Sequence, residues 1–267
     1  IIGTYQSTLT NFGYLPEAWA DNCKTERLLG VSLTGQMDCI AVSQREVLNE
    51  LKEEALVTNK EYAKKFEINP STCITCVKPS GNVSQMVGCS SGLHGAFADY
   101  YIRRIRIAYN DPLLKLAKDQ DVPMFPEVGQ SVENATTWVL EFPQKAPETS
   151  ILQSKMSAIE QLEYWKKVKL SFTEHNPSVT IYVKDNEWVR VADWVYRNWE
   201  IIGGLSFLPA SDHVYQLAPY EKISKEEYEK RLSALSNLDL SLLSEYEMFD
   251  NTQPQAELAC TSGTCEL

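Results

Sequence analysis

The chain has 267 residues, of which 43% are hydrophobic and 10% aromatic, and its formal net charge is −11. This composition is sufficient for a sizeable core and argues against disorder along most of the chain. The acidic balance argues against a nucleic-acid groove, and no apolar run reaches the roughly 20 residues of a membrane helix.

The first half of the chain is expected to contain an ordered N-terminal segment, a long helix and a short strand. Residues 1–20 are small and polar, and an apolar run lies within 22–34. Apolar residues at helical spacing predict a helix over 42–66. β-branched residues predict a strand over 72–78, and the loop 79–82 follows it.

Helical and strand patterns alternate through the second half, which predicts an α/β fold. Ser224, with Glu227 three residues later, is typical of a helix N-terminus. The polar residues after Phe249 predict a mobile tail. Strands are expected at 100–108, 136–142 and 178–183, and helices at 112–119, 151–168, 186–202 and 223–235.

The first candidate site is the loop Lys78–Ser84, which directly follows the predicted strand at 72–78. Gly81 permits a tight turn, and Ser80, Ser84 and exposed backbone amides can donate hydrogen bonds to phosphate oxygens. Walker-type spacing is absent, so an ordinary strand-to-helix turn stays open as an alternative.

The seven cysteines are interpreted as reduced thiols with one redox pair, because no secretion signal precedes them. Cys260 and Cys265 lie near the chain end and are separated by small residues, which suits thiol–disulfide exchange. Cys73 and Cys76 fall on opposite faces of a predicted strand, so we expect buried, inert thiols. A zinc site that joins the two pairs is the weaker alternative, and we predict no metal.

The three histidines, His94, His175 and His213, are far apart in the sequence and favour structural roles. His94 lies in a glycine-rich turn close to the loop at 78–84, so it is the best candidate ligand among them.

Tyr100 and Tyr101 could line a pocket, although a place in an aromatic core is the default expectation. The nearby arginines at positions 103, 104 and 106 could pair with an anion, or could form a solvated strand face.

Several motifs, in the same order, resemble adenosylcobalamin-dependent ribonucleoside-triphosphate reductases of the monomeric, class II type. The resemblance extends over essentially the whole chain and ends with the terminal cysteine pair. The motifs are ERLLGVSLTG at 26–35, ITCVKPSGNVS at 74–84, GLHGAF at 92–97, YYIRRIR at 100–106, NPSVT at 176–180 and GGLSFLP at 203–209.

The resemblance implies an α/β fold that forms the C-terminal part of a ten-stranded reductase barrel with outer helices. Residues 1–210 would form this part of the barrel, including the phosphate loop. Residues 211–250 would form a helical region facing the cobalamin, and 251–267 a flexible tail with the redox cysteine pair.

The resemblance also implies roles for individual residues. Cys260 and Cys265 would carry reducing equivalents from thioredoxin or a similar dithiol. The family commonly has Thr where this chain has Asn82, so the contact of this position with the substrate phosphate differs. The substrate phosphates would lie against Pro79, Ser80, Gly81, Asn82, Val83 and Ser84, and adenosylcobalamin against His94, Tyr100, Tyr101 and Tyr215.

The implied reaction converts ribonucleoside triphosphates to deoxyribonucleoside triphosphates by thiyl-radical chemistry. The Asn-x-Cys-x-Glu-like motif of the radical cysteine is absent from this sequence. We therefore expect a fragment that is inactive alone. We expect it in the cytoplasm, or in the host cytoplasm if the gene is carried by a phage. It would be poorly soluble unless bound to the missing N-terminal portion. A non-catalytic cobalamin- or nucleotide-binding module, or a fragment of another ribonucleotide reductase class, stays open as an alternative.

Overall fold

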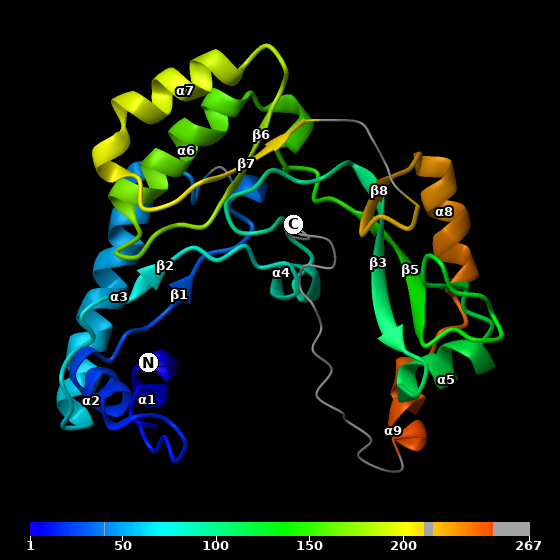
Figure 1. The fold of residues 1–267 in the computed structure, drawn as a ribbon, viewed down its shortest axis with the longest axis horizontal. Helices are drawn as coiled ribbons and strands as arrows, with labels where there is room; N and C mark the ends of the chain where they lie inside the picture. The colour runs from blue at the N-terminus through cyan, green and yellow to red at the C-terminus, as the bar shows by residue number, and fades with distance from the viewer. Residues whose placement is uncertain (40, 211–215, 248–267) are drawn as a thin grey trace. The chain divides into compact units, whose positions relative to one another are not determined.

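The computed structural model describes residues 1–39, 41–210 and 216–247, which form two compact units (Figure 1). Unit 1 consists of Ile1–Ala96 and Pro147–Ser211. Unit 2 consists of Phe97–Ala146 and the described part of Asp212–Glu266. Unit 2 therefore interrupts unit 1 in the sequence, and each unit has a hydrophobic core of its own.

Unit 1 is built on parallel strands. β1 pairs with β2, and β6 pairs with β7, both in parallel. A parallel bridge between Val77 and Pro177 links the two pairs. The strands are β1 (Val31–Ser32), β2 (Thr75–Cys76), β6 (Thr180–Val183) and β7 (Ser206–Pro209).

Helices pack against these strands and complete unit 1. α6 and α7 run side by side next to β6 (Figure 1), and the rings of Trp165 and Trp194 meet edge to face at 6.2 Å. Trp165 is fully buried, and its indole N–H donates to the Pro177 carbonyl at 2.9 Å. The helices are α1 (Ile2–Gln6), α2 (Glu17–Glu26), α3 (Arg45–Lys65), α4 (Val83–Met86), α6 (Ala158–Ser171) and α7 (Trp188–Arg197), with short 3-10 turns at Gln36–Asp38, Gln153–Lys155 and Trp199–Ile201.

Unit 2 is an antiparallel sheet in the order β4-β5-β3-β8. Ile105 of β3 lies opposite Leu140 of β5, and this face packs on α5, where Leu114 and Ala117 are buried. The elements are β3 (Tyr100–Ala108), α5 (Pro112–Asp119), β4 (Met124–Pro126), β5 (Thr137–Lys145), β8 (Tyr220–Lys222), α8 (Lys225–Ala234), a 3-10 turn (Leu240–Leu242) and α9 (Leu243–Tyr246).

A buried ionic cluster lies on the other face of this sheet. The guanidinium of Arg104 donates to Glu141 at 2.7 Å and to the Ala218 carbonyl at 2.9 Å, and it also pairs with Glu221. Arg231 of α8 pairs with the second oxygen of Glu141. Because Arg104 and Glu141 are both almost fully buried, each charge depends on the other for compensation.

The structure confirms most of the elements expected from the sequence and corrects several of their bounds. The strand at 100–108 and the helix at 112–119 are confirmed as β3 and α5. The helix expected from 151 begins at Ala158 instead, because Ser157 and Glu160 form a capping box that fixes its start. The strand expected over 72–78 is reduced to Thr75–Cys76.

The broad expectation of an α/β fold is confirmed, and the described residues contain eight strands. That these strands form the C-terminal part of a ten-stranded barrel stays a prediction. None of the described helices has both the length and the apolar character that crossing a membrane requires.

Candidate functional site

The loop at 79–84 lies at the carboxyl end of β2 and leads into the four-residue helix α4. In parallel α/β sheets, ligands bind beyond the carboxyl ends of the strands. The exposed Lys78 precedes the loop, and its backbone N–H donates to Ser32 of β1 at 3.0 Å. The loop predicted as a phosphate site thus occupies the edge of the sheet where such sites form.

The backbone of this loop presents a row of amide groups. Ser80 has a φ of +60°, a left-handed conformation that few side chains adopt. Among the described residues, no acceptor receives the backbone N–H groups of Gly81, Asn82 and Val83. Consecutive N–H groups that follow a left-handed residue form a concavity suited to an anion.

Ser84 has a different role from the one expected. Its side chain is fully buried, its hydroxyl donates to the Ser80 carbonyl, and it lies 3.2 Å from the Ser91 hydroxyl. The Ser84 amide also donates to Ser80. Ser84 therefore holds the left-handed turn in place, and its hydroxyl does not face outward toward a phosphate.

Two segments next to the loop, at 34–38 and 90–92, are joined to each other by hydrogen bonds. The Thr34 hydroxyl donates to the Ser90 carbonyl at 3.0 Å and accepts from the Gly92 amide at 2.9 Å. The Asp38 carboxylate accepts from the Ser90 amide at 2.6 Å. Gly92 has a φ of +52°, and a Cβ there would lie 2.6 Å from the Lys78 carbonyl oxygen. Sequence reasoning assigned no role to Thr34, although it lies in the motif at 26–35, and gave no signal for Asp38, because both act through contacts distant in the sequence.

His94 is held by both of its ring nitrogens. Nε2 accepts from the Thr180 amide at 3.0 Å, so Nδ1 carries the proton and donates to the Ser91 carbonyl at 3.0 Å. Burial lowers the pKa of His94, while the hydrogen bond to Ser91 opposes that shift. The ring is thus a neutral structural group, and contact with a cofactor would have to use its carbon atoms or its face.

Tyr100 and Tyr101 lie on opposite faces of β3, as the alternation of a strand requires. Tyr100 contacts Tyr228 of α8, with ring centroids 5.1 Å apart. Tyr101 instead contacts Phe97 and Tyr220, at 5.9 Å and 5.7 Å. The two tyrosines therefore cannot line one pocket together. Their predicted cofactor contacts remain predictions, while Tyr215, Cys260 and Cys265 lie outside the described residues.

The described cysteines form no disulfide. Cys76 is buried, and burial raises the pKa of its thiol, as it also does for Cys89. Cys73 is half-buried and lies just before β2 rather than in it. No group of three or more metal-ligating side chains occurs within the described part of the chain. The thiols of Cys76 and Cys89 are protonated at neutral pH, which agrees with an inert role for Cys76.

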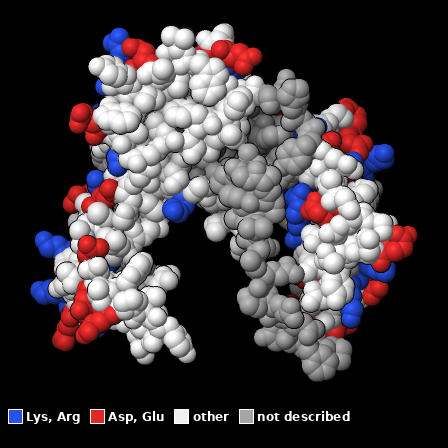
Figure 2. All heavy atoms as spheres, in the orientation of Figure 1, with Lys and Arg blue, Asp and Glu red and all other residues white. Residues whose placement is uncertain are grey.

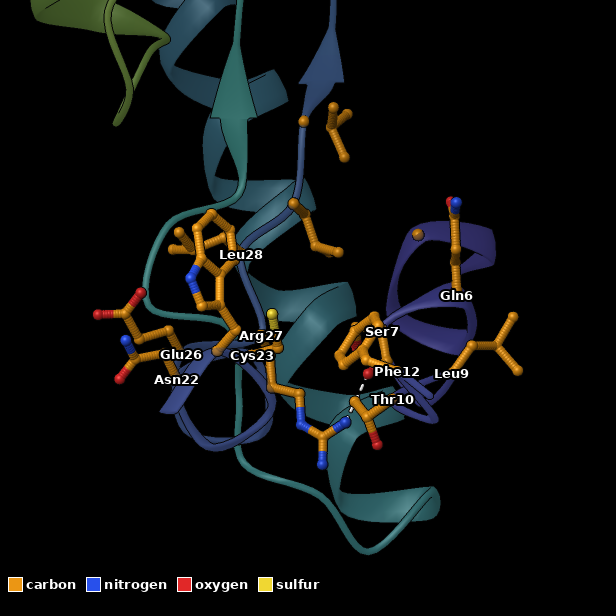
Figure 3. A pocket seen from close by; sticks show the side chains of 15 residues that line it. Gln6, Ser7, Leu9, Thr10, Phe12, Asn22, Cys23, Glu26, Arg27 and Leu28 are labelled. Atoms are coloured by element: carbon orange, nitrogen blue, oxygen red, sulfur yellow. Dashed lines mark hydrogen bonds between the residues drawn. The ribbon is translucent and has the colours of Figure 1, made fainter. Parts of the chain in front are cut away.

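The sequence did not indicate a pocket of about 760 Å³ that lies near the N-terminus (Figure 3). The guanidinium of Arg27 donates across it to the Ser7 carbonyl, and the Arg27 Nε atom is buried without an acceptor among the described residues. Leu9 and Trp19, which help to line it, are 64% and 62% exposed. Residues 1–16 carry no charged side chain, and Figure 2 shows this segment, at the lower left, as a mostly uncharged surface.

Sequence comparison finds relatives with a common description. No protein-family model matches the chain. It is 28% identical over 223 residues to an adenosylcobalamin-dependent ribonucleoside-triphosphate reductase of Lactobacillus helveticus, covering 79% of this chain and 29% of that protein. A probable enzyme of the same description from Dictyostelium discoideum is 27% identical over 273 residues, covering 93% of this chain and 33% of the relative.

Structure comparison agrees at the level of the fold. A crystal structure of a B12-dependent, class II ribonucleotide reductase superposes with a TM-score of 0.72 at 23% identity, covering 87% of this chain and 36% of that one. The chain therefore spans about a third of the length of the proteins it matches. The resemblance read from the motifs is confirmed: this chain is a relative, over part of their length, of the adenosylcobalamin-dependent ribonucleoside-triphosphate reductases.

Proposed function

We propose that this chain is the C-terminal portion of a B12-dependent ribonucleotide reductase and that it binds the substrate's phosphates. The observation that carries the proposal is the row of N–H groups at Gly81, Asn82 and Val83, beyond the carboxyl end of a parallel strand. The similarity of the chain to ribonucleoside-triphosphate reductases supports the triphosphate of a ribonucleotide as the anion.

The residues of the chain would act by positioning the substrate. The amides of the loop would donate to phosphate oxygens, while Ser84 and Thr34 keep the loop in its binding shape. Lys78 would add positive charge beside the loop. A site that binds the phosphates in this way fixes the position of the ribose, which is the part of the substrate that reacts.

Adenosylcobalamin, the cofactor of the relatives, would supply the radical chemistry when bound. Unit 2 offers an aromatic surface on which part of the cofactor would lie, since Phe97, Tyr101 and Tyr220 form a cluster of rings. Cys260 and Cys265 would deliver two electrons and two protons by closing a disulfide, and thioredoxin or a similar dithiol would reduce them again.

The remaining part of the reductase would occupy the uncharged N-terminal surface. The relatives are about three times as long as this chain, and the radical-cysteine motif is absent from it. Ile2, Leu9 and Tyr14 are strongly exposed here, which isolated soluble domains rarely tolerate over a large area.

The proposal is tested by two substitutions at Ser80. Ser80→Val places a β-branched residue in a left-handed conformation and should weaken the binding of CTP about tenfold, since the strain is about 1–2 kcal/mol. Ser80→Gly keeps the conformation and should bind CTP as the unchanged chain does. Calorimetric titration of the full chain with CTP, and with cytidine as the phosphate-free control, measures both.

The outcomes separate three possibilities. Weaker CTP binding in Ser80→Val alone supports binding by the backbone amides. Weaker CTP binding in both variants would mean that the Ser80 hydroxyl contacts the phosphate. This result would contradict the proposed binding by the backbone amides. Equal CTP affinity in all three proteins, or equal affinity for CTP and cytidine, would contradict phosphate binding at this loop.

Catalysis is tested by adding the N-terminal portion of the reductase. The mixture should form deoxyribonucleotides in the presence of adenosylcobalamin and a dithiol, and either part alone should not. A chain that binds its ligands but never yields product with that partner would be a non-catalytic binding module instead.

A further inference from the structure

Three arginines on β3 have different electrostatic surroundings. Arg104 pairs with Glu141 and Glu221, and Arg106 pairs with Glu127. The side chain of Arg103 makes no hydrogen bond or ion pair with any described residue. In a chain with a net charge of −11, an arginine without a carboxylate partner stands out from its two neighbours.

The guanidinium of Arg103 lies over an aromatic ring. Its central carbon is 4.6 Å from the ring centroid of Tyr220, and its Nε and Nη1 atoms are buried without an acceptor. Arg103 and Tyr101 are two residues apart on β3 and therefore share one face of the strand. Tyr220 contacts both Tyr101 and Phe97, with centroids 5.7 Å and 5.4 Å away, and Phe97 is 40% exposed.

This arrangement has an energetic cost that a ligand would remove. A buried donor that lacks a partner is unfavourable, and more so when it is charged. The stacking on Tyr220 offsets only part of this cost, because the attraction between a cation and a ring is weak. A planar guanidinium is suited to bidentate binding of a phosphate, and the adjacent rings are suited to stacking on a flat base.

We propose that Arg103, with the rings of Phe97, Tyr101 and Tyr220, binds a phosphate ester carried on an aromatic base. Two molecules supply this chemistry. One is the nucleotide tail of cobalamin, in which a phosphodiester is joined through a ribose to a benzimidazole; this source rests on the proposed function. The other is a free nucleoside monophosphate, which does not depend on that function.

Equilibrium dialysis of the full chain distinguishes the two sources. Cyanocobalamin is compared with dicyanocobinamide, which lacks the nucleotide tail, and AMP is compared with adenosine. The unchanged chain should bind the phosphate-bearing member of at least one pair more tightly, by about tenfold, because the phosphate adds charge-assisted hydrogen bonds to the guanidinium. Arg103→Gln should remove this preference and leave the affinity for the phosphate-free member unchanged.

Two further variants serve as controls. Arg103→Lys keeps the charge but not the bidentate geometry and should recover only part of the preference. Arg190→Gln removes the same charge from an exposed position in unit 1 and should have no effect. Arg103→Met should melt at the same temperature as the unchanged chain or higher, since it removes a half-buried charge that has no ion-pair partner among the described residues.

Loss of the preference for cyanocobalamin alone would identify the cofactor tail, and loss of the preference for AMP alone would identify a nucleotide. An Arg103→Gln variant that keeps every preference, or an Arg103→Met variant that melts well below the unchanged chain, would overturn the proposal. Because Ser80 and CTP are not involved, a failure here is distinguishable from a failure of the phosphate loop.

Discussion

At position 94, one imidazole ring connects the loop at Ser91 to the first residue of β6, Thr180, through both of its nitrogens. The Thr180 amide requires an unprotonated Nε2, so charging the ring would break this hydrogen bond. Burial lowers the pKa of His94 in the folded chain, whereas in the unfolded chain it returns to about 6.5. The unfolded state then binds more protons than the folded state below that pH.

This difference predicts a loss of stability in mild acid. The free energy of unfolding should fall as pH decreases below about 6.5, by at most about 1.4 kcal/mol per pH unit from this group. Urea unfolding between pH 5 and pH 8 measures this pH dependence for the unchanged chain and for His94→Gln. The variant should be less stable at pH 8 but should show a shallower slope, and equal slopes would contradict the assignment.

Sequence reasoning identified the loop at 79–84 but not the role of each residue within it. The glycine, the serines and the preceding strand indicated a turn with exposed amides. Sequence reasoning could not indicate that the Ser84 side chain points inward. Its direction depends on the left-handed φ of Ser80 and on the contact with Ser91. The opposite directions of Tyr100 and Tyr101, by contrast, follow from strand alternation alone and could have been predicted.

At the scale of elements, local signals located the helices better than the short strands. The helix predicted at 112–119 matches α5, which Asp111 caps and Pro112 begins. α2 was missed, since its first residue follows Pro16 without a capping side chain and none of its residues is buried. β1 and β7 are short and are defined by their partners β2 and β6, so periodicity could not reveal them.

The sheet of unit 2 depends on the carboxylate of Glu141. Glu141→Gln would remove the charge that the buried Arg104 shares with the half-buried Arg231, and would leave each arginine with one partner, Glu221 or Glu227. We expect the free energy of unfolding to fall by about 3 kcal/mol. The matched control is Glu61→Gln, which breaks the exposed pair with Lys65 on α3 and should cost less than about 1 kcal/mol. Urea unfolding that gives equal losses for both variants would contradict this role for the cluster.

At the scale of the whole molecule, the sequence predicted the α/β class but not the division into units. Phe97–Ala146 interrupts unit 1 and joins a later segment, and neither composition nor linker signals mark that change. The ranges 1–210, 211–250 and 251–267 describe proposed roles, whereas the compact units divide the chain differently. The division arises from strand pairing between β3 and β8, which are far apart in the sequence.

The uncharged N-terminal surface predicts self-association of the chain when it is alone. Leu9→Lys should lower the aggregated fraction in sedimentation velocity, because it places a charge within exposed apolar surface. Asn11→Lys adds the same charge at an exposed polar residue of the same segment and should have a smaller effect. A monodisperse unchanged chain, or equal effects of the two variants, would contradict an apolar docking surface here.

The bridge between Val77 and Pro177 has a consequence for synthesis on the ribosome. The two halves of the parallel sheet cannot join until roughly 100 further residues have been made, and the whole of Phe97–Ala146 emerges in between. Contacts between such distant residues form slowly, since a long loop must close first. The nascent chain therefore presents β2 with an open edge for several seconds, the interval in which a chaperone would be most useful to it.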